Sequence, residues 1–253
     1  MVDVALHFHK TGHRGKIYAI STHGMLPVVH KLGFTYPSFA EELEPMNRIT
    51  DILKSVRRDI GNAEATGSNW RAVIDSLRPA TQKLWLALPL AETRYFMQHL
   101  SRYWNVARHR MTAEAGKILD EMKLLGTLQI LKGRLKGIAV NDAEKFQVVY
   151  GSLGRAHYVS ADVLVNCIGS EANFAKIDSE FLRNLVQRRH IRNDDLSLGI
   201  KADPDGKVLD KHDKYSPFVY SMGTALKGKL LETTAIPEIR TQSRDLALKL
   251  LAD

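Results

Sequence analysis

The sequence predicts a mixed α/β fold that carries a helical insertion and a small antiparallel β-meander. Three observations lead to this prediction. A helix leads through a glycine-bearing turn into a strand within residues 1–20, a mostly helical block occupies residues 38–125, and short segments with the two-residue period of strands follow from Thr127. The 253 residues, of which 44% are hydrophobic and 25% charged, have the composition of an ordinary globular protein.

The first element is expected to be a helix at residues 1–9, with Ala5 and Leu6 on its apolar face. A turn at residues 11–15 leads from it into a strand at residues 16–20. A helix that feeds a buried strand in this way is typical of the second half of a βαβ nucleotide-binding unit. Neither the first strand of such a unit nor its glycine-rich phosphate loop precedes the helix. We therefore expect the chain to lack half of a phosphate-binding cradle and to have little catalytic activity alone.

The helical block is expected to be interrupted at its helix-breaking residues, namely Pro45, residues 61–68, residues 78–79, Pro89 and Asn105. Its last helix has the clearest signals, because Thr112 can cap its N-terminus and Gly126 suits its end. Between them, apolar side chains recur at the spacing of one helical face, at Ala115, Ile118, Leu119 and Met122. This stripe is expected to pack into the core.

Four strand candidates follow and are expected to form the antiparallel meander: residues 128–131, 135–140, 146–150 and 156–159. The most apolar segment, residues 163–168, is expected to be a strand buried on both faces that ends at a ligand edge beside Gly169. It contains the single cysteine, Cys167, so an intrachain disulfide and a dithiol redox pair are excluded. We interpret this thiol as a buried small hydrophobe rather than as a nucleophile.

The C-terminal part again alternates strands and helices. We expect a helix, a hairpin, a strand and a closing helix, at residues 179–189, 203–206, 218–222 and 237–251. Pro237 suits a helix start, but the preceding Ile236 has no side-chain oxygen to cap the free amides. A flavin carbonyl, which becomes anionic on reduction, is a suitable acceptor at such an end. Capping by Thr233, by Thr234 or by water is the alternative.

The formal net charge of +8 favours anionic partners such as nucleotide phosphates. Because the basic residues are scattered, nucleic-acid binding has the least support among the functions considered. No segment approaches the roughly 20 apolar residues of a membrane span, and the N-terminus lacks the apolar core of a signal peptide. We therefore expect a cytoplasmic protein without membrane contact. The histidines show no metal-ligand spacing, so no metal is assigned.

Six segments carry a family resemblance: residues 1–6 (MVDVAL), 12–15 (GHRG), 24–27 (GMLP), 103–110 (YWNVARHR), 166–169 (NCIG) and 233–240 (TTAIPEIR). In them the chain resembles the bacterial FAD/NAD(P)-binding proteins of the YdhS-like type, which are flavoproteins with two dinucleotide sites. The resemblance runs essentially end to end along this chain and keeps the order of the motifs. It covers only the C-terminal portion of the family.

The resemblance implies a partial Rossmann-like fold with two dinucleotide sites. Residues 1–37 and 105–170 then correspond to the remnant of an NAD(P)-binding domain, residues 38–104 to the helical insertion, and residues 171–253 to the C-terminal part of an FAD-binding domain. The implied activity is that of a flavin- and NAD(P)-dependent oxidoreductase, in which hydride passes from nicotinamide to flavin in the intact relative. No residue of this chain is an evident acid, base or nucleophile.

At the NAD(P) site the resemblance places Ser21, Thr22 and His23, where the adenosine ribose or its 2′-phosphate would lie. No carboxylate ends this strand to bind a ribose diol, and Thr22 and His23 stand where relatives tend to carry arginine, so the choice between NADH and NADPH stays open. An exposed loop histidine is the alternative for His23. The other cofactor contacts that the resemblance implies are Cys167, Ile168, Gly169, Gly223 and Thr224, and the uncapped helix start adds Thr234, Ala235 and Ile236. Arg108 and Arg110 form a dense basic group that suits a phosphate or a substrate carboxylate, with a solvated loop as the alternative.

A second hypothesis is a non-catalytic binding or assembly module. In this hypothesis an orphaned sheet edge and an exposed cofactor face are covered by another copy of the chain, by a partner chain or by a missing N-terminal portion.

Overall fold

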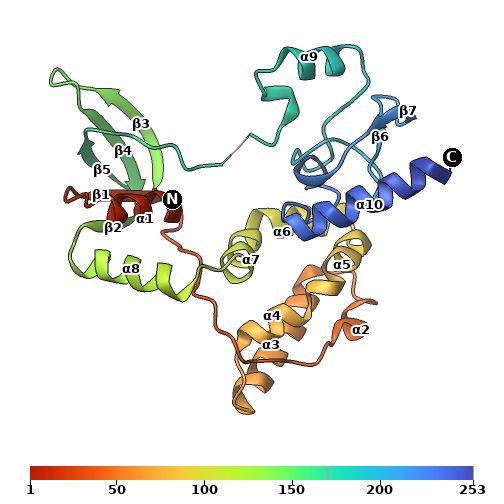
Figure 1. The fold of residues 1–253 in the computed structure, drawn as a ribbon, viewed down its shortest axis with the longest axis horizontal. Helices are drawn as coiled ribbons and strands as arrows, with labels where there is room; N and C mark the ends of the chain where they lie inside the picture. Colours follow the sequence, from red (N-terminus) through yellow and green to blue (C-terminus); the bar gives the residue numbers. More distant parts are fainter. Residues whose placement is uncertain (170, 253) are drawn as a thin grey trace. The chain divides into compact units, whose positions relative to one another are not determined.

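The computed structural model describes residues 1–169 and 171–252, and the chain divides into two compact units (Figure 1). Unit 1 comprises residues 1–33 and 102–169, and unit 2 comprises residues 34–101 and the C-terminal segment from residue 170. The predicted helical insertion and the C-terminal segment therefore fall within the same unit.

Unit 1 is built on two parallel strands, β1 (Ile17–Ser21) and β2 (Leu128–Lys132), which pair over their whole length. Helix α1 (Val2–Lys10) precedes β1, and α8 (Ala113–Leu124) precedes β2. The expected helix and strand at the start of the chain are thus confirmed. Residues 128–131 were predicted to belong to the antiparallel meander, and this was wrong, because β2 pairs with β1 in parallel.

The core of unit 1 lies between these two strands and the two helices. Ala5 of α1 and Leu119 of α8 are each 1% exposed, and they pack with Met122 and Leu128. Alternate residues of the strands, Ile17 and Ala19 in β1 and Ile130 in β2, border this cluster, so one face of the sheet meets the helices. The predicted apolar stripe of α8 is confirmed, as is its cap, since the Ala115 N–H donates to the Thr112 hydroxyl at 3.2 Å.

The meander of unit 1 is a three-stranded antiparallel sheet of β3 (Arg134–Val140), β4 (Phe146–Ser152) and β5 (Arg155–Ala161), with β4 in the centre. Val148 and Tyr150 of the central strand are buried. A short helix, α7 (Ser101–Arg108), lies before α8 along the chain. Asn105 was predicted to break a helix and instead lies inside α7.

The apolar segment at residues 163–168 does not form the predicted strand buried on both faces. It has no regular secondary structure and no strand partner among the described residues, and its side chains are exposed. Ile168 is 90% exposed. A continuous apolar run becomes a buried strand only where neighbouring strands and covering layers exist on both sides, and the described residues provide none.

Unit 2 begins with a set of short helices: α2 (Ala40–Leu43), α3 (Ile49–Ala65), α4 (Trp70–Ser76), the 3₁₀ turn η1 (Arg78–Ala80), α5 (Thr81–Ala87) and α6 (Leu90–His99). Leu43 and Val73 are fully buried, and the Trp85 and Phe96 rings meet edge to face at 5.5 Å. The predicted break at Pro89 is confirmed, since α6 starts after it. The predicted break within residues 61–68 is also confirmed, because α3 ends at Ala65, although Gly61 itself lies inside the helix.

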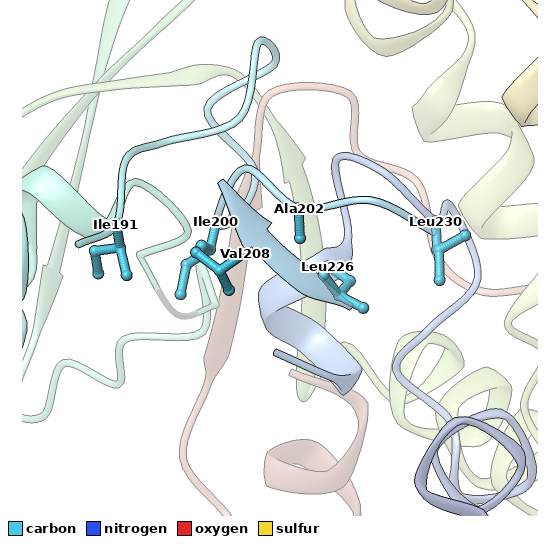
Figure 2. Close-up of a cluster of buried hydrophobic side chains, with 6 residues drawn as sticks. All are labelled: Ile191, Ile200, Ala202, Val208, Leu226 and Leu230. Carbon is cyan, nitrogen blue, oxygen red and sulfur yellow. The ribbon is translucent and has the colours of Figure 1, made fainter. Parts of the chain in front are cut away.

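The rest of unit 2 forms a second cluster around a two-stranded antiparallel sheet. Its elements are η2 (Phe174–Lys176), α9 (Glu180–Gln187), β6 (Lys207–Leu209), β7 (Tyr215–Tyr220), η3 (Gly223–Leu226) and α10 (Ile236–Ala252). The predicted helices at 179–189 and 237–251 are confirmed by α9 and α10. Figure 2 shows the buried side chains of this cluster, Ile191, Ile200, Ala202, Val208, Leu226 and Leu230.

Candidate functional site

The first candidate site of unit 1 is the edge where both parallel strands end. Ser21, the last residue of β1, lies opposite Lys132, the last residue of β2. The chain continues from these positions to His23 and to Arg134, each two residues further along. Because parallel strands point the same way, the loops after both strands begin at one edge, which is where open α/β sheets bind ligands.

The loop that carries His23 is held against the end of β2. The Ser21 hydroxyl accepts the Gly24 N–H at 3.0 Å, which closes a tight turn over Thr22 and His23. Gly24 has a φ of +62°, and a Cβ at this position would lie 3.1 Å from the Lys132 Cβ. Glycine therefore permits both the left-handed backbone and the close approach of the loop to Lys132.

Positive charge gathers around the exposed His23 ring. Desolvation lowers the pKa of the imidazole below its ordinary value of 6.5, and so do the charges of three neighbours, Arg102, Lys132 and Arg134. These three side chains come from α7, β2 and β3. Within residues 1–169 and 171–252, no ion pair involves Lys132 or Arg134. We call His23, Arg102, Lys132 and Arg134 the strand-end cluster.

The other basic residues predicted for unit 1, Arg108 and Arg110, lie at the end of α7 and just after it. Arg110 donates its Nε to the Ala107 carbonyl at 2.7 Å, and its Nη1 lies 3.4 Å from His30 Nδ1. The Val28 N–H to Val106 carbonyl bond, at 3.4 Å, joins the same two segments. Arg110 therefore helps to hold residues 28–30 against the end of α7. Arg108 lies at the last position of that helix.

Cys167, Ile168 and Gly169 lie in the exposed segment that follows the meander. Cys167 was predicted to be a buried hydrophobe, and this was wrong, because the residue is exposed. The Asn166 side-chain oxygen accepts the Ile168 N–H at 3.1 Å, so the segment makes a local turn at this point. Gly169 has a φ of +92°, a conformation that glycine adopts without strain.

In unit 2, the predicted flavin contact Gly223 is part of a closed hydrogen-bond network. The Gly223 N–H donates to Gln242 Oε1 at 2.8 Å, and the Thr233 hydroxyl donates to the Gly223 carbonyl at 3.1 Å. Gln242 Nε2 donates in turn to the Thr233 hydroxyl oxygen at 2.5 Å. Thr233 is 0% exposed. We call Gly223, Thr233 and Gln242 the Thr233 network; both backbone polar groups of Gly223 are bonded within it.

The start of α10 is open to solvent. Thr234, Ala235 and Ile236 are exposed, and Ile236 is 82% exposed. Thr233 bonds to the Gly223 carbonyl, and Thr234 makes no side-chain hydrogen bond within the described chain, so neither hydroxyl caps the helix. Of the three alternative caps that were predicted, capping by water stays a prediction. Thr224 is also exposed.

A cavity of about 710 Å³ lies beside this network in unit 2. Its apolar floor includes Met222, Leu226 and Leu246. Two ion pairs lie along its wall, Arg78 to Glu238 at 2.9 Å and Lys249 to Asp205 at 2.8 Å. None of the predicted flavin contacts lines it, although their sequence neighbours Met222 and Pro237 do.

Sequence reasoning missed three members of the strand-end cluster. Lys132 and Arg134 lie more than a hundred residues after His23, and only the parallel pairing of β1 with β2 brings them together. The available signal was that two strand candidates each end next to basic residues. Arg102 was predicted to lie in the helical insertion, and it belongs to unit 1.

No helix within the described chain is both long enough and apolar enough to cross a membrane. The described residues also contain no group of three His, Cys, Asp or Glu side chains placed to hold a metal ion. Comparison with models of protein families and with curated proteins finds no match for this chain.

Proposed function

We propose that unit 1 binds a nicotinamide dinucleotide and that unit 2 contributes contacts to a flavin, as in flavin- and NAD(P)-dependent oxidoreductases. The observation that carries the proposal is the strand-end cluster, where cations gather at the carboxyl ends of two parallel strands. This is the edge at which α/β proteins bind nucleotides, and positive charge there attracts their phosphates.

The residues of unit 1 fit the adenosine end of the dinucleotide. Lys132 and Arg134 supply exposed donors, and the tight turn at Ser21 and Gly24 places Thr22 and His23 beside them. Bound NAD(P)H would supply the hydride, while this chain's residues orient the nucleotide. In this proposal the role of unit 1 is to bind and orient the nucleotide.

Unit 2 offers fewer contacts to a flavin than the resemblance implies. Gly223 has no free backbone group to offer, because the Thr233 network uses both. The exposed start of α10 at Ala235 and Ile236 retains amides that suit a flavin carbonyl. Glu238 already places a carboxylate in the first turn, where it pairs with Arg78. A polarised carbonyl therefore suits this end better than a second full negative charge does.

Titration calorimetry of the purified full chain with NADP⁺ and with NAD⁺ tests the dinucleotide part of the proposal. Lys132→Ala/Arg134→Ala should weaken the binding of NADP⁺ by at least about tenfold, since charge-assisted hydrogen bonds contribute roughly 1.5–3 kcal/mol each. The matched control is Arg14→Ala/Lys16→Ala, which removes one arginine and one lysine, both exposed, from the opposite end of β1. The absence of binding by either dinucleotide, or equal weakening by both double variants, would contradict the proposal.

FAD titration followed by quenching of flavin fluorescence tests the other part. Ile236→Asp places a carboxylate beside the free amides of α10, so it should weaken FAD binding. Leu248→Asp makes the same change at an exposed position near the far end of the helix and should not. Unchanged FAD affinity in Ile236→Asp would remove the start of α10 from the flavin site.

A second function, an assembly module, is favoured by one observation, the exposed apolar segment at residues 163–168. A short uncharged segment of high β-propensity without proline is suited to pair with an identical strand of a second copy. Val165→Lys should then abolish a dimer in sedimentation velocity, while Leu153→Lys, at a 97% exposed turn, should not. A wild-type chain that sediments as a monomer at all concentrations would exclude this function.

A further inference from the structure

Two basic segments of unit 2 that are separate in the sequence meet in the structure. Residues 188–192 (RRHIR) follow α9, and residues 211–214 (KHDK) lie in the turn between β6 and β7. The Lys211 N–H donates to the Arg189 carbonyl at 3.4 Å, and the Arg192 guanidinium pairs with the Asp213 carboxylate. In the sequence these segments are two of several scattered basic runs, whereas in the structure they form one surface.

The carboxylates beside these segments have partners within the protein. Asp213 pairs with Arg192. Asp210 accepts the N–H groups of His212 and Lys214 at 2.7 Å and 2.9 Å, which closes the turn at residues 210–214. Asp210 therefore holds the turn in which the second basic segment lies.

The other four cations of the two segments are Arg188, Arg189, Lys211 and Lys214, and we call these four the α9-end surface. All four are exposed. Within residues 1–169 and 171–252, none of them forms an ion pair. Neighbouring charges of one sign without counter-ions attract an anion that carries several charges.

One of these cations lies where the backbone favours glycine. Arg189 has a φ of +66°, its N–H donates to the Val186 carbonyl at 3.0 Å, and the His190 N–H donates to the Leu185 carbonyl at 2.9 Å. Glycine most often closes a helix in this way, because a side chain is strained in the left-handed region. Attraction to the helix dipole accounts for the arginines at the end of α9, but not for the lysines of the second segment.

Exposed aromatic rings lie beside the same cations. The Phe218 ring is 68% exposed and meets the His190 ring at a centroid distance of 5.8 Å. Tyr215 follows Lys214 in the chain, and its ring lies 5.8 Å from the Lys207 ammonium. An anion does not need such rings, whereas an unpaired base stacks on them.

We propose that the α9-end surface binds single-stranded nucleic acid, with its four cations on the phosphates and the Phe218 ring stacked on a base. Cations along the backbone next to aromatic rings are the means by which proteins hold single strands without reading their sequence. An acidic peptide would use the cations alone, and a duplex keeps its bases stacked on one another. The proposal is independent of the dinucleotide and flavin sites.

Fluorescence anisotropy of the full chain with a labelled oligothymidylate of about 12 nucleotides tests the stacking. Phe218→Leu keeps an apolar side chain but removes the ring, so it should weaken binding by about fivefold or more. Phe181→Leu is the matched control, because its ring is 70% exposed and lies at the opposite end of α9. Equal affinity in both variants would overturn the proposal.

The phosphate contacts are tested with Arg189→Gly/Lys211→Ala. Glycine relieves the left-handed backbone at position 189, and a thermal melt checks that the variant stays folded. Binding should weaken by about tenfold or more, and the slope of log affinity against log salt should fall by about 1.4, since two phosphate contacts are lost. Arg14→Ala/Lys16→Ala removes the same charge from exposed positions of unit 1 and should leave the slope unchanged.

Competition experiments separate single strands from other polyanions. Polyglutamate and a duplex of the same length should displace the probe at least about fivefold less well than unlabelled oligothymidylate does. Equal competition by polyglutamate would identify a surface for acidic proteins, and the proposal would fail. It would also fail if the oligothymidylate did not bind, or if both double variants weakened its binding equally, because the attraction would then come from the net charge of the chain.

Discussion

The strand-end cluster of unit 1 and the Thr233 network of unit 2 differ in whether their charged and polar groups have partners. In the cluster, cations lie near one another, and Lys132 and Arg134 form no ion pair within the described residues. In the network, the N–H and the carbonyl of Gly223 both find partners in Thr233 and Gln242. Uncompensated like charges weaken a fold and favour an anionic ligand, whereas a closed buried network stabilises a fold and offers little to a ligand. The comparison therefore supports the proposed binding role of Lys132 and Arg134 and indicates a structural role for the Thr233 network.

The largest effect on stability is expected from Thr233→Val. The variant keeps the volume but removes the hydroxyl, so the Gly223 carbonyl loses its donor and Gln242 Nε2 loses its acceptor. Two unsatisfied buried groups should lower the free energy of unfolding by about 2–3 kcal/mol. Urea denaturation followed by tryptophan fluorescence reports this, since Trp85 is buried in unit 2. Thr234→Val, at an exposed position next in sequence, is the control; equal losses in both would refute the structural role of the network.

Two adjacent carboxylates of unit 2, Asp194 and Asp195, should contribute to stability with opposite pH dependences. Burial, followed by the charge of Asp195, raises the pKa of Asp194 above 3.8, and Asp194 Oδ2 is buried without a hydrogen-bond partner in the described chain. A raised folded-state pKa means that the stability from this group is complete below 3.8 and is lost as the pH rises through the higher value. At pH 7 Asp194→Asn should therefore stabilise the protein, by on the order of 1 kcal/mol after allowing for solvent screening.

The pKa of Asp195 is shifted in the opposite direction, so this residue serves as the control. The hydrogen bond from Lys201 lowers the pKa of Asp195. Its contribution is present above the ordinary aspartate pKa and is lost as the pH falls through the lowered value. Asp195→Asn should thus lower the melting temperature at pH 7, while Asp194→Asn raises it. A shift of the same sign in both variants would show that the burial of Asp194 does not disfavour its charge.

Removing charge from the strand-end cluster should separate binding from stability. Lys132→Ala/Arg134→Ala relieves repulsion between like charges, so the free energy of unfolding should rise by about 0.5 kcal/mol while the proposed binding of NADP⁺ weakens by at least about tenfold. Arg14→Ala/Lys16→Ala should leave both quantities unchanged. Thermal melts at low and at high salt provide the measurement, since the gain should disappear when salt screens the repulsion. A destabilised double variant would mean that these side chains support the fold instead.

The contrast between the two regions also explains what the sequence could predict. Local signals were sufficient for α8, where Thr112 and an apolar stripe act within one helix, and for the turn at residues 203–206, where the Gly206 N–H donates to the Asp203 carbonyl at 3.1 Å. The cluster depends on pairing between strands that are far apart in sequence. No local pattern distinguishes residues 128–131 as a parallel strand from an antiparallel one, so Lys132 could not be placed beside His23 in advance.

At residues 163–168 the local sequence pattern was clear, but the structure that it predicted did not form. Its apolar, β-branched composition predicts a buried strand. Composition shows which conformation a segment prefers, but not whether neighbouring strands and covering layers are present. Thr233 was considered only as a helix cap. Its actual partners, Gly223 and Gln242, lie ten residues before it and nine after it, and only the folded arrangement of η3 against α10 brings them within hydrogen-bond distance.

The smallest effect is expected from the ion pair at the rim of the unit 2 cavity. Lys249 donates to Asp205 at 2.8 Å, and their side chains are 38% and 66% exposed. Water solvates both charges almost as well as they solvate each other, and the lysine loses rotational freedom when it holds one geometry. Lys249→Met should therefore leave the melting temperature unchanged within error, at low and at high salt. A loss of stability as large as that of Thr233→Val would mean that exposed ion pairs stabilise unit 2 as much as its buried network does. The contrast between closed networks and exposed charges would then no longer separate structural roles from binding roles.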